Sequence, residues 1–192
     1  LLVAGAERLP KPLASVVKDP LEFDSAVAAP KRYSLLTVAN DSISVHRLVQ
    51  AVVRDQLPEK ERKRWAEAAV QLVNDAFPQE GLDVRTWPEC SLLLPHAIAA
   101  AGHAEGLGAA KKETQHLLNQ AGLYLNGRAE FKVAEALYER ALLIAEIVYG
   151  REHQEVATII NNLGGVLKDM GDITGAKELY ERALKIDEKT LG

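Results

Sequence analysis

Two kinds of side chain in this sequence stand where they could contact a ligand. His46 lies in SISVHRLVQ, where a short alternating strand passes into a helix. An imidazole N–H at the first turn of a helix is well placed to meet an anion. Asn119 and Asn161 stand at equivalent positions of a repeated segment, and amides both donate to and accept from a peptide backbone. The alternatives are that His46 only caps its helix and that the asparagines are only exposed polar residues.

The other reactive side chains do not combine into a catalytic or metal site. His96 and His103 could share a helix face, but no third ligand stands at a spacing typical of zinc. Cys90 is the single cysteine and is expected to be a small buried residue. The sequence has no GxxxxGK[ST] motif, and neither a nucleophile with a base nor paired carboxylates in a cleft can be assembled from it. It therefore predicts that this chain is not an enzyme and holds no cofactor itself.

Composition and charge limit the partners. The chain has 192 residues, a formal net charge of −4, 47% hydrophobic and 26% charged residues, which is ordinary for a folded domain. A negative net charge gives no electrostatic reason to bind nucleic acid or an anionic membrane. No apolar run is long enough to span a bilayer. We expect a cytoplasmic protein, and the missing initiator Met predicts a piece of a longer chain.

A repeat organises the C-terminal part. When residues 113–150 are aligned with 155–192, 14 of 38 pairs are identical, and the string LYERAL occurs in both copies. A period of roughly 20 to 50 residues predicts a solenoid, and each copy is expected to form two helices. In the second copy these span 155–170 and 174–190, with Gly164 facing Ala176. The residues expected to face inward on the last helix are Ala176, Leu179, Tyr180, Ala183, Leu184 and Ile186.

The small and large positions of this pattern resemble the tetratricopeptide repeat. They are Ala121, Gly122, Leu125, Ala134, Tyr138 and Ala141, and then Leu163, Gly164, Leu167, Ala176, Tyr180 and Ala183. The period is longer than is usual for the family, and the extra residues lie in the connection YGREHQEVAT, as in the long-period subtype found in kinesin light chains. The resemblance implies a protein or peptide ligand on a concave surface formed by His116, Asn119, Leu123, Asn126, Thr158, Asn161, Gly165 and Lys168.

Two repeats are fewer than the three or so that a solenoid needs to bury its faces. The last helix is therefore expected to present an uncovered apolar side, which would favour self-association. Residues 57–77 and 87–103 predict a preceding pair of helices, with Pro95 expected to kink or divide the second and residues 101–110 as a flexible joint. The basic cluster at residues 60–64 is interpreted as a solvated helix face rather than a nucleic-acid or targeting signal.

Residues 1–57 predict a helix, a β-hairpin and a second helix. Phe23, Ala26, Val27 and Tyr33 recur at helical spacing, and SLLTV and SISVH alternate around Asn40 and Asp41, which suit a turn. This order is typical of the end of a winged-helix domain. A DNA-binding role is the minority interpretation, because only Lys31 and Arg32 stand close together in the presumed recognition segment.

The segment VHRLVQAVVRDQL resembles the end of the winged-helix domain of STAND-class nucleotide switches, the NB-ARC family. WPECSLLLPHA followed by long-period repeats is similar to its bacterial and fungal members. The family carries a Met-His-Asp motif here, whose histidine reaches the β-phosphate of ADP. This chain has Val45, His46 and Arg47 instead, so the resemblance implies nucleotide sensing by His46 and leaves the aspartate's hydrogen bonds in doubt. ADP or ATP would belong to the parent protein, an ATPase through an absent domain.

The sequence therefore predicts a mostly α chain. Residues 1–57 would be the C-terminal part of a winged-helix domain, 58–110 a helical bridge or degenerate repeat hairpin, and 111–192 two 42-residue tetratricopeptide repeats in an α-α superhelix. Its predicted role is an interaction and sensor module that couples a bound protein or peptide to a nucleotide switch. The alternatives are a winged-helix regulator that binds DNA and a self-assembling scaffold.

Overall fold

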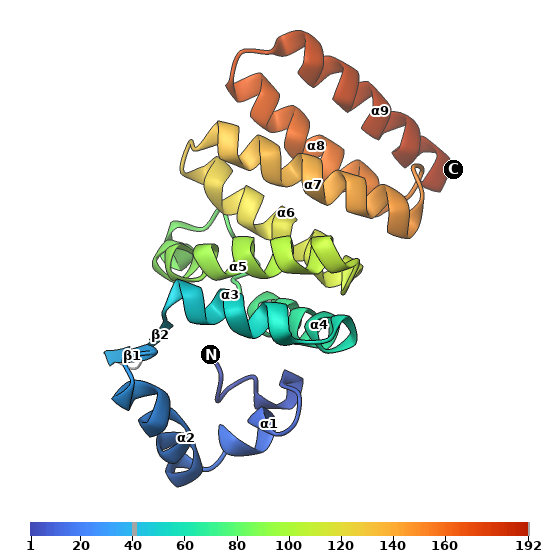
Figure 1. Ribbon diagram of the computed structural model, residues 1–192. Coiled ribbons are helices and arrows are strands. Elements are labelled where there is room, and N and C mark those ends of the chain that lie inside the picture. Colours follow the sequence, from blue (N-terminus) through green and yellow to red (C-terminus); the bar gives the residue numbers. More distant parts are fainter. Residues whose placement is uncertain (40–41, 192) are drawn as a thin grey trace.

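The computed structural model describes residues 1–39 and 42–191, and most of them are helical (Figure 1). A two-stranded antiparallel sheet stands between the first and the later helices. This confirms the predicted fold class. The elements are η1 Ala6–Arg8, α1 Leu13–Val16, α2 Pro20–Arg32, β1 Leu36–Ala39, β2 Ser42–Val45, α3 Arg47–Gln56, α4 Glu59–Ala76, η2 Val84–Thr86, α5 Trp87–Leu107, α6 Lys111–Gly127, α7 Phe131–Tyr149, α8 Gln154–Asp169 and α9 Ile173–Leu191.

Helices α4 to α9 form three hairpins that stack on one another (Figure 1). Within each hairpin the two helices contact along their length, and α5 packs on α6 as α7 packs on α8. One hydrophobic core runs through the whole stack, from Val70 in α4 to Ile186 in α9. The two helices expected in each copy of the repeat are therefore present, and in the second copy their ends lie next to the expected ones.

Helix α5 is longer than the sequence suggested. Residues 101–110 were expected to form a flexible joint, but α5 continues through Leu107 and passes Pro95 without a break. Its last turns stay helical because Ala101 and Ala104 are fully buried in the core. The joint is reduced to residues 108–110, in which the φ of Gly108, 60°, lies in the left-handed region that glycine adopts without steric cost.

A glycine and a tyrosine set the spacing of each hairpin in the repeat. A methyl group on Gly122 would lie 2.7 Å from Cε1 of Tyr138, and one on Gly164 would lie 2.9 Å from Cε1 of Tyr180. Gly164 was expected to face Ala176, and the atoms nearest to a methyl group there are those of Tyr180. The tyrosine ring reaches the glycine because it extends further from α9 than the alanine methyl does.

The arginine of LYERAL has the same task in both copies. Arg140 of α7 donates to Glu105 of α5, with Nη2 2.6 Å from Oε2. One repeat later, Arg182 of α9 donates to Glu146 of α7. The second helix of each repeat is thus joined by one Arg–Glu pair to the second helix of the preceding hairpin. The repeated LYERAL string therefore contributes contacts between hairpins as well as within them.

The N-terminal part is packed much less closely. A small cluster of Ala6, Leu9 and Val17 covers Leu72 of α4, and β1 pairs with β2 in the register Leu36 with Val45. Neither α2 nor α3 contains a buried residue, and Leu21 and Leu48 are exposed. The predicted turn residues Asn40 and Asp41 lie outside the described residues. The helix, hairpin and helix are present in the expected order, with apolar faces open.

The glycine contacts predict a graded stability series. Gly122→Ala should lower the free energy of unfolding by roughly 1–3 kcal/mol, because the fully buried Tyr138 cannot move away. Gly164→Ala should cost less, since the partly exposed ring of Tyr180 can shift. Urea denaturation followed by circular dichroism would measure both.

Gly165→Ala is the matched control on the same turn as Gly164. A methyl group there would meet only the Tyr180 hydroxyl, at 3.8 Å, and alanine is the better helix former by about 1 kcal/mol. This variant should be neutral or more stable. A loss as large as that of Gly122→Ala would contradict the assigned role of the tyrosine contacts.

Candidate functional site

The concave face predicted on α6 is largely taken up by contacts with neighbouring elements. Asn119 is 8% exposed, and its Oδ1 accepts a hydrogen bond from Nδ2 of Asn162 at 2.9 Å. His116 is partly buried, with Nδ1 2.8 Å from Oδ1 of Asn74. Asn126 is partly buried, and its Oδ1 has no hydrogen-bond partner among the described residues. The contacts of Asn119 and His116 thus join neighbouring helices of the stack.

The equivalent face of α8 is open. Thr158, Asn161 and Lys168 are exposed, and Gly165 is partly buried. Thr158 Oγ1 is engaged only with the carbonyl of Gln154, one turn earlier in the same helix. The two matched asparagines therefore differ in exposure: Asn119 is enclosed between helices, whereas Asn161 lies on the surface of α8.

A chain of amide side chains runs beneath this surface. Asn162 of α8 donates to Asn119 of α6, and Asn119 Nδ2 lies 3.4 Å from Oε1 of Gln120. Gln120 in turn donates to the backbone carbonyl of Gln79, in the connection between α4 and α5. Buried amides need such partners, because an unpaired polar group in the interior costs about 1–3 kcal/mol. This series of amide side chains links all three hairpins through hydrogen bonds, which require a particular geometry.

The long connection between α4 and α5 covers the C-terminal half of α6. Gly81 approaches α6 so closely that a methyl group there would lie 2.9 Å from the backbone nitrogen of Tyr124. Trp87 anchors the connection through a hydrogen bond from Nε1 to the Gly81 carbonyl and through an edge contact with Tyr124. Sequence reasoning missed this cover and the role of Asn162. The available signal was a long connection containing a glycine, whereas the later helices α5 to α9 are joined by short turns.

His46 caps α3. Its Nδ1 accepts a hydrogen bond from the backbone nitrogen of Leu48 at 3.2 Å. Because Nδ1 is the acceptor, the proton of the neutral ring resides on Nε2. The side chain is exposed, so Nε2–H is free to donate to a ligand outside the helix. The capping alternative is therefore observed, and it leaves the second nitrogen available.

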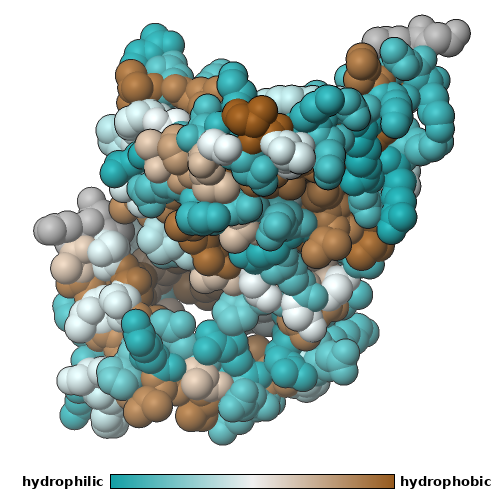
Figure 2. Space-filling view, turned by 90° about the horizontal axis from the view of Figure 1, so that it is seen from above, coloured by the Kyte–Doolittle hydropathy of each residue, from teal (hydrophilic) through white to brown (hydrophobic). Residues whose placement is uncertain are grey.

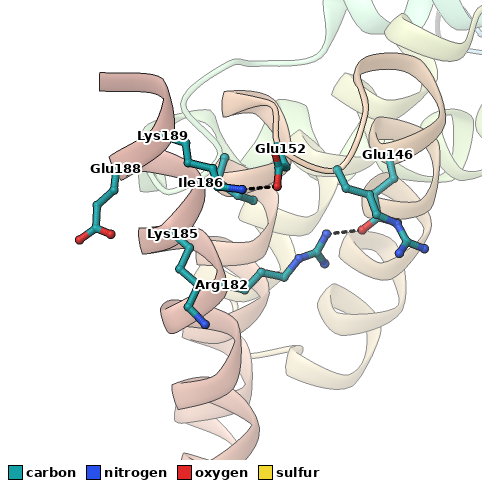
Figure 3. Close-up of a pocket in the computed structure, with 8 residues that line it drawn as sticks. Glu146, Glu152, Arg182, Lys185, Ile186, Glu188 and Lys189 are labelled. Carbon is teal, nitrogen blue, oxygen red and sulfur yellow. Dashed lines mark hydrogen bonds and ion pairs between the residues drawn. The ribbon is translucent and has the colours of Figure 1, made fainter. Parts of the chain in front are cut away.

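A charged hollow of about 620 Å³ lies where α9 meets the end of α7 and the start of α8 (Figure 3). Arg182 and Arg151 both contact Glu146, and Lys189 pairs with Glu152. Most of its charges are thus neutralised in pairs. Glu188 belongs to the same rim, but its carboxylate points away from these pairs in Figure 3.

A mainly apolar hollow of about 410 Å³ lies along the outer side of α9. Tyr180 and Leu184 were expected to face inward. Tyr180 does contact Gly164 of α8 but is still 37% exposed, and Leu184 is 57% exposed. The expectation was wrong for Leu184, because no described element packs on this side of α9. The view down this end of the stack shows hydrophobic side chains interrupting the hydrophilic surface (Figure 2). Of the predicted ligand-binding residues, Lys168 lies on the rim of this hollow.

The remaining candidate residue, Cys90, lies in the hydrophobic core. Cys90 is fully buried, and burial raises the pKa of its thiol. Within residues 1–39 and 42–191, no three His, Cys, Asp or Glu side chains gather in a way that could hold a metal ion. No helix in the same ranges is long and apolar enough to cross a membrane.

Comparisons with known proteins identify the type of repeat. Residues 113–189 match the family model described as tetratricopeptide repeat, so α6 to α9 form a superhelix of such repeats. A solved structure described as "Crystal structure of BtubC (BKLC) from P. vanneervenii" is similar over 97% of this chain and 70% of that chain. Its TM-score is 0.54 at 17% sequence identity, which shows a shared fold. No curated protein matches the chain.

His116 predicts a pH-dependent stability. Burial lowers its pKa from 6.5, and the carboxylate of Glu155 opposes the shift only in part. Below pH 6.5 the unfolded chain therefore binds more protons than the folded chain, and the free energy of unfolding falls as the pH drops through the lowered pKa.

The variant His116→Gln should remove this component and flatten the profile between pH 7 and pH 5, while changing it little above pH 7. Urea unfolding at several pH values would measure both proteins. Parallel profiles for the two would show that His116 does not contribute to the pH dependence.

Proposed function

We propose that this chain is the interaction and sensor module of a cytoplasmic STAND-type nucleotide switch. Tetratricopeptide repeats are protein-interaction modules rather than enzymes, and residues 113–189 match their family model. The finer assignment rests on the surface of α8 and on the geometry of His46.

The open face of α8 supports binding of an extended peptide or protein segment. Asn161 presents a free amide on the surface, next to Asn162, which the buried Asn119 holds in place. A helix fixed on one side therefore presents Thr158, Asn161 and Lys168 at fixed positions on the other. An amide can bind a peptide backbone whatever its side chains are, and Lys168 adds attraction for an acidic group. This exposed row is the observation that carries the proposal.

The N-terminal part supports contact with a nucleotide-binding domain. Helix α2, the β-hairpin and α3 follow in the order expected for the end of a winged-helix domain. Leu21 on α2 and Leu48 and Val52 on α3 are exposed, so they offer apolar surface for further helices of such a domain. The Nε2–H of His46 is directed outside the helix and would donate to the β-phosphate of ADP in the parent protein.

Coupling between the two parts follows from their different rigidity. The stack of α4 to α9 shares one core, whereas α3 ends at Gln56 and joins α4 through Leu57 and Pro58. A ligand on the repeats acts on this stack, to which residues 1–17 are also attached through Leu72, and we propose that α3 and the β-hairpin move relative to the stack at this short joint. Such a ligand shifts the switch only if it binds better in one arrangement than in the other.

The peptide-binding proposal predicts a specific effect of Asn161. Peptides selected on the chain from a random library should bind Asn161→Ala about two- to tenfold more weakly, since one hydrogen bond contributes roughly 0.5–1.5 kcal/mol. The free energy of unfolding should hardly change, because Asn161 is exposed. Fluorescence anisotropy of labelled peptides would measure the affinity.

Leu143→Lys is the control, because Leu143 is exposed on α7 and its counterpart in the second repeat is Lys185. Peptides whose binding is insensitive to Asn161 but sensitive to Leu184 would occupy the end of the stack instead, and that result would reject the concave face.

The nucleotide proposal predicts a distinct role for His46. In a chain that includes the nucleotide-binding domain, His46→Ala should speed ADP dissociation roughly ten- to a hundredfold, because a hydrogen bond to a charged group contributes about 1.5–3 kcal/mol. His153→Ala is the control, since His153 caps α8 through the same Nδ1 contact. Stopped-flow displacement of a fluorescent ADP analogue would measure the rate. Equal ADP dissociation rates in the His46→Ala and His153→Ala variants would show that His46 acts only as a helix cap.

A further inference from the structure

A cavity of about 380 Å³ lies where the end of α3 meets the hairpin of α4 and α5. Its volume falls within the range of roughly 300–1,000 Å³ that is typical of small-molecule sites. The residues that line it come from all three helices and from Leu57, in the joint between α3 and α4. They include neither His46 nor any residue of α8, so this cavity is separate from both surfaces discussed above.

Small residues keep the cavity open. Four of them line it, two from α4 and two from α5: Ala66, Ala69, Gly102 and Gly106. A methyl group on either glycine would contact nothing from another described element within 4 Å. These glycines are therefore not required for close helix packing, in contrast to those of the repeats, and the space beside α5 stays unfilled.

Two arginines from different helices line this cavity. Neither Arg54 of α3 nor Arg62 of α4 forms an ion pair within the part of the chain that the structure describes, whereas seven other arginines do. His103 adds an imidazole, and Asp55 is the carboxylate among the lining residues. The basic groups therefore outnumber the acidic one, although the net charge of the chain is −4. An anionic group complements this lining.

Trp65 gives the same cavity an aromatic wall. Its side chain is partly buried, as are those of Leu57 and Leu107, which also line the cavity. An indole face favours a planar partner, because stacked rings bury apolar area in a defined geometry. A molecule that fits the lining thus combines a flat apolar body with an anionic group.

We propose that this cavity binds a small planar aromatic anion. The ring system of the ligand packs against Trp65 over the small residues, and its acidic group contacts Arg54 and Arg62. Because these arginines belong to α3 and α4, the ligand bridges the joint between the two helices. Such a ligand favours one arrangement of the joint over others. That consequence rests on the proposed function, whereas the binding itself does not.

Fluorine NMR of the intact chain labelled with 5-fluorotryptophan tests the proposal, because the chain has two tryptophans, Trp65 and Trp87. The variant Trp65→Phe assigns the two signals. Titration with 2-naphthoate should shift the signal of Trp65 and leave that of Trp87, which packs against Tyr124, in place. Neutral 2-naphthalenemethanol has the same rings and should bind at least about fivefold more weakly, since it forms no ion pair.

Two results of this titration would overturn the proposal. One is a Trp65 signal that does not shift up to the solubility limit of 2-naphthoate. The other is equal affinity for 2-naphthoate and 2-naphthalenemethanol, which would show that the cavity does not select an anion.

Gly102→Leu fills the cavity without removing a charge. The new side chain enters open space, and leucine is a better helix former than glycine, so the melting temperature should not fall. The affinity for 2-naphthoate should fall at least about tenfold, because the leucine occupies the space of the rings. Unchanged affinity in this folded variant would place the ligand elsewhere and reject the site.

Substitution of each arginine tests the contacts with the acidic group. Arg54→Gln and Arg62→Gln should each weaken binding of 2-naphthoate about two- to fivefold, as expected for exposed ion pairs. Lys63→Gln is the matched control and should have no effect, since Lys63 is an exposed basic residue beside Arg62 that does not line the cavity. Equal effects of Arg62→Gln and Lys63→Gln would contradict a direct contact. An effect of Arg62→Gln without one of Arg54→Gln would contradict the bridge across the joint.

Discussion

The close contact between a glycine on one helix and a tyrosine ring on the next is the constraint on which this structure depends. Gly122 and Gly164 leave room for the rings of Tyr138 and Tyr180 where any side chain would collide with them. This contact fixes how near the two helices of a hairpin lie and at which level they meet. The alanines Ala141 and Ala183 of the second helices are then buried.

Two sets of polar contacts follow from that spacing. The first helices are joined by side-chain hydrogen bonds between His116 and Asn74 and between Asn162 and Asn119. The second helices are joined by the Arg–Glu pairs of Arg140 and Arg182. Apolar contacts alone tolerate sliding of one helix along another, whereas hydrogen bonds between buried amides require one register. The polar contacts therefore favour one register of the three stacked hairpins.

The two ends of the stack differ in how they meet their surroundings. Residues 1–17 close the first hairpin over Leu72, and the connection between α4 and α5 lies over α6. By contrast, α8 and α9 leave the row of Thr158, Asn161 and Lys168, an apolar face and the carboxylate of Glu188 exposed. Exposed apolar surface recurs on α2 and α3. The exposed surface of the molecule thus lies where its own elements do not cover it, at the second repeat and around His46.

Much of the fold was determined by the sequence alone. The internal repeat, its paired LYERAL strings and the glycines at Gly122 and Gly164 led to two helical hairpins at nearly the observed boundaries, and the alternation around the strands led to the β-hairpin. These predictions succeeded because helix formation and hairpin packing depend on residue types at fixed local spacing. Only the tertiary structure decided that Asn119 is enclosed while Asn161 is open, and that Tyr138 is buried while Tyr180 is exposed. Each pair carries the same residue in the same local pattern, so the pattern could not distinguish them. Burial is set by whichever element packs on the outside, and that neighbour comes from another part of the chain.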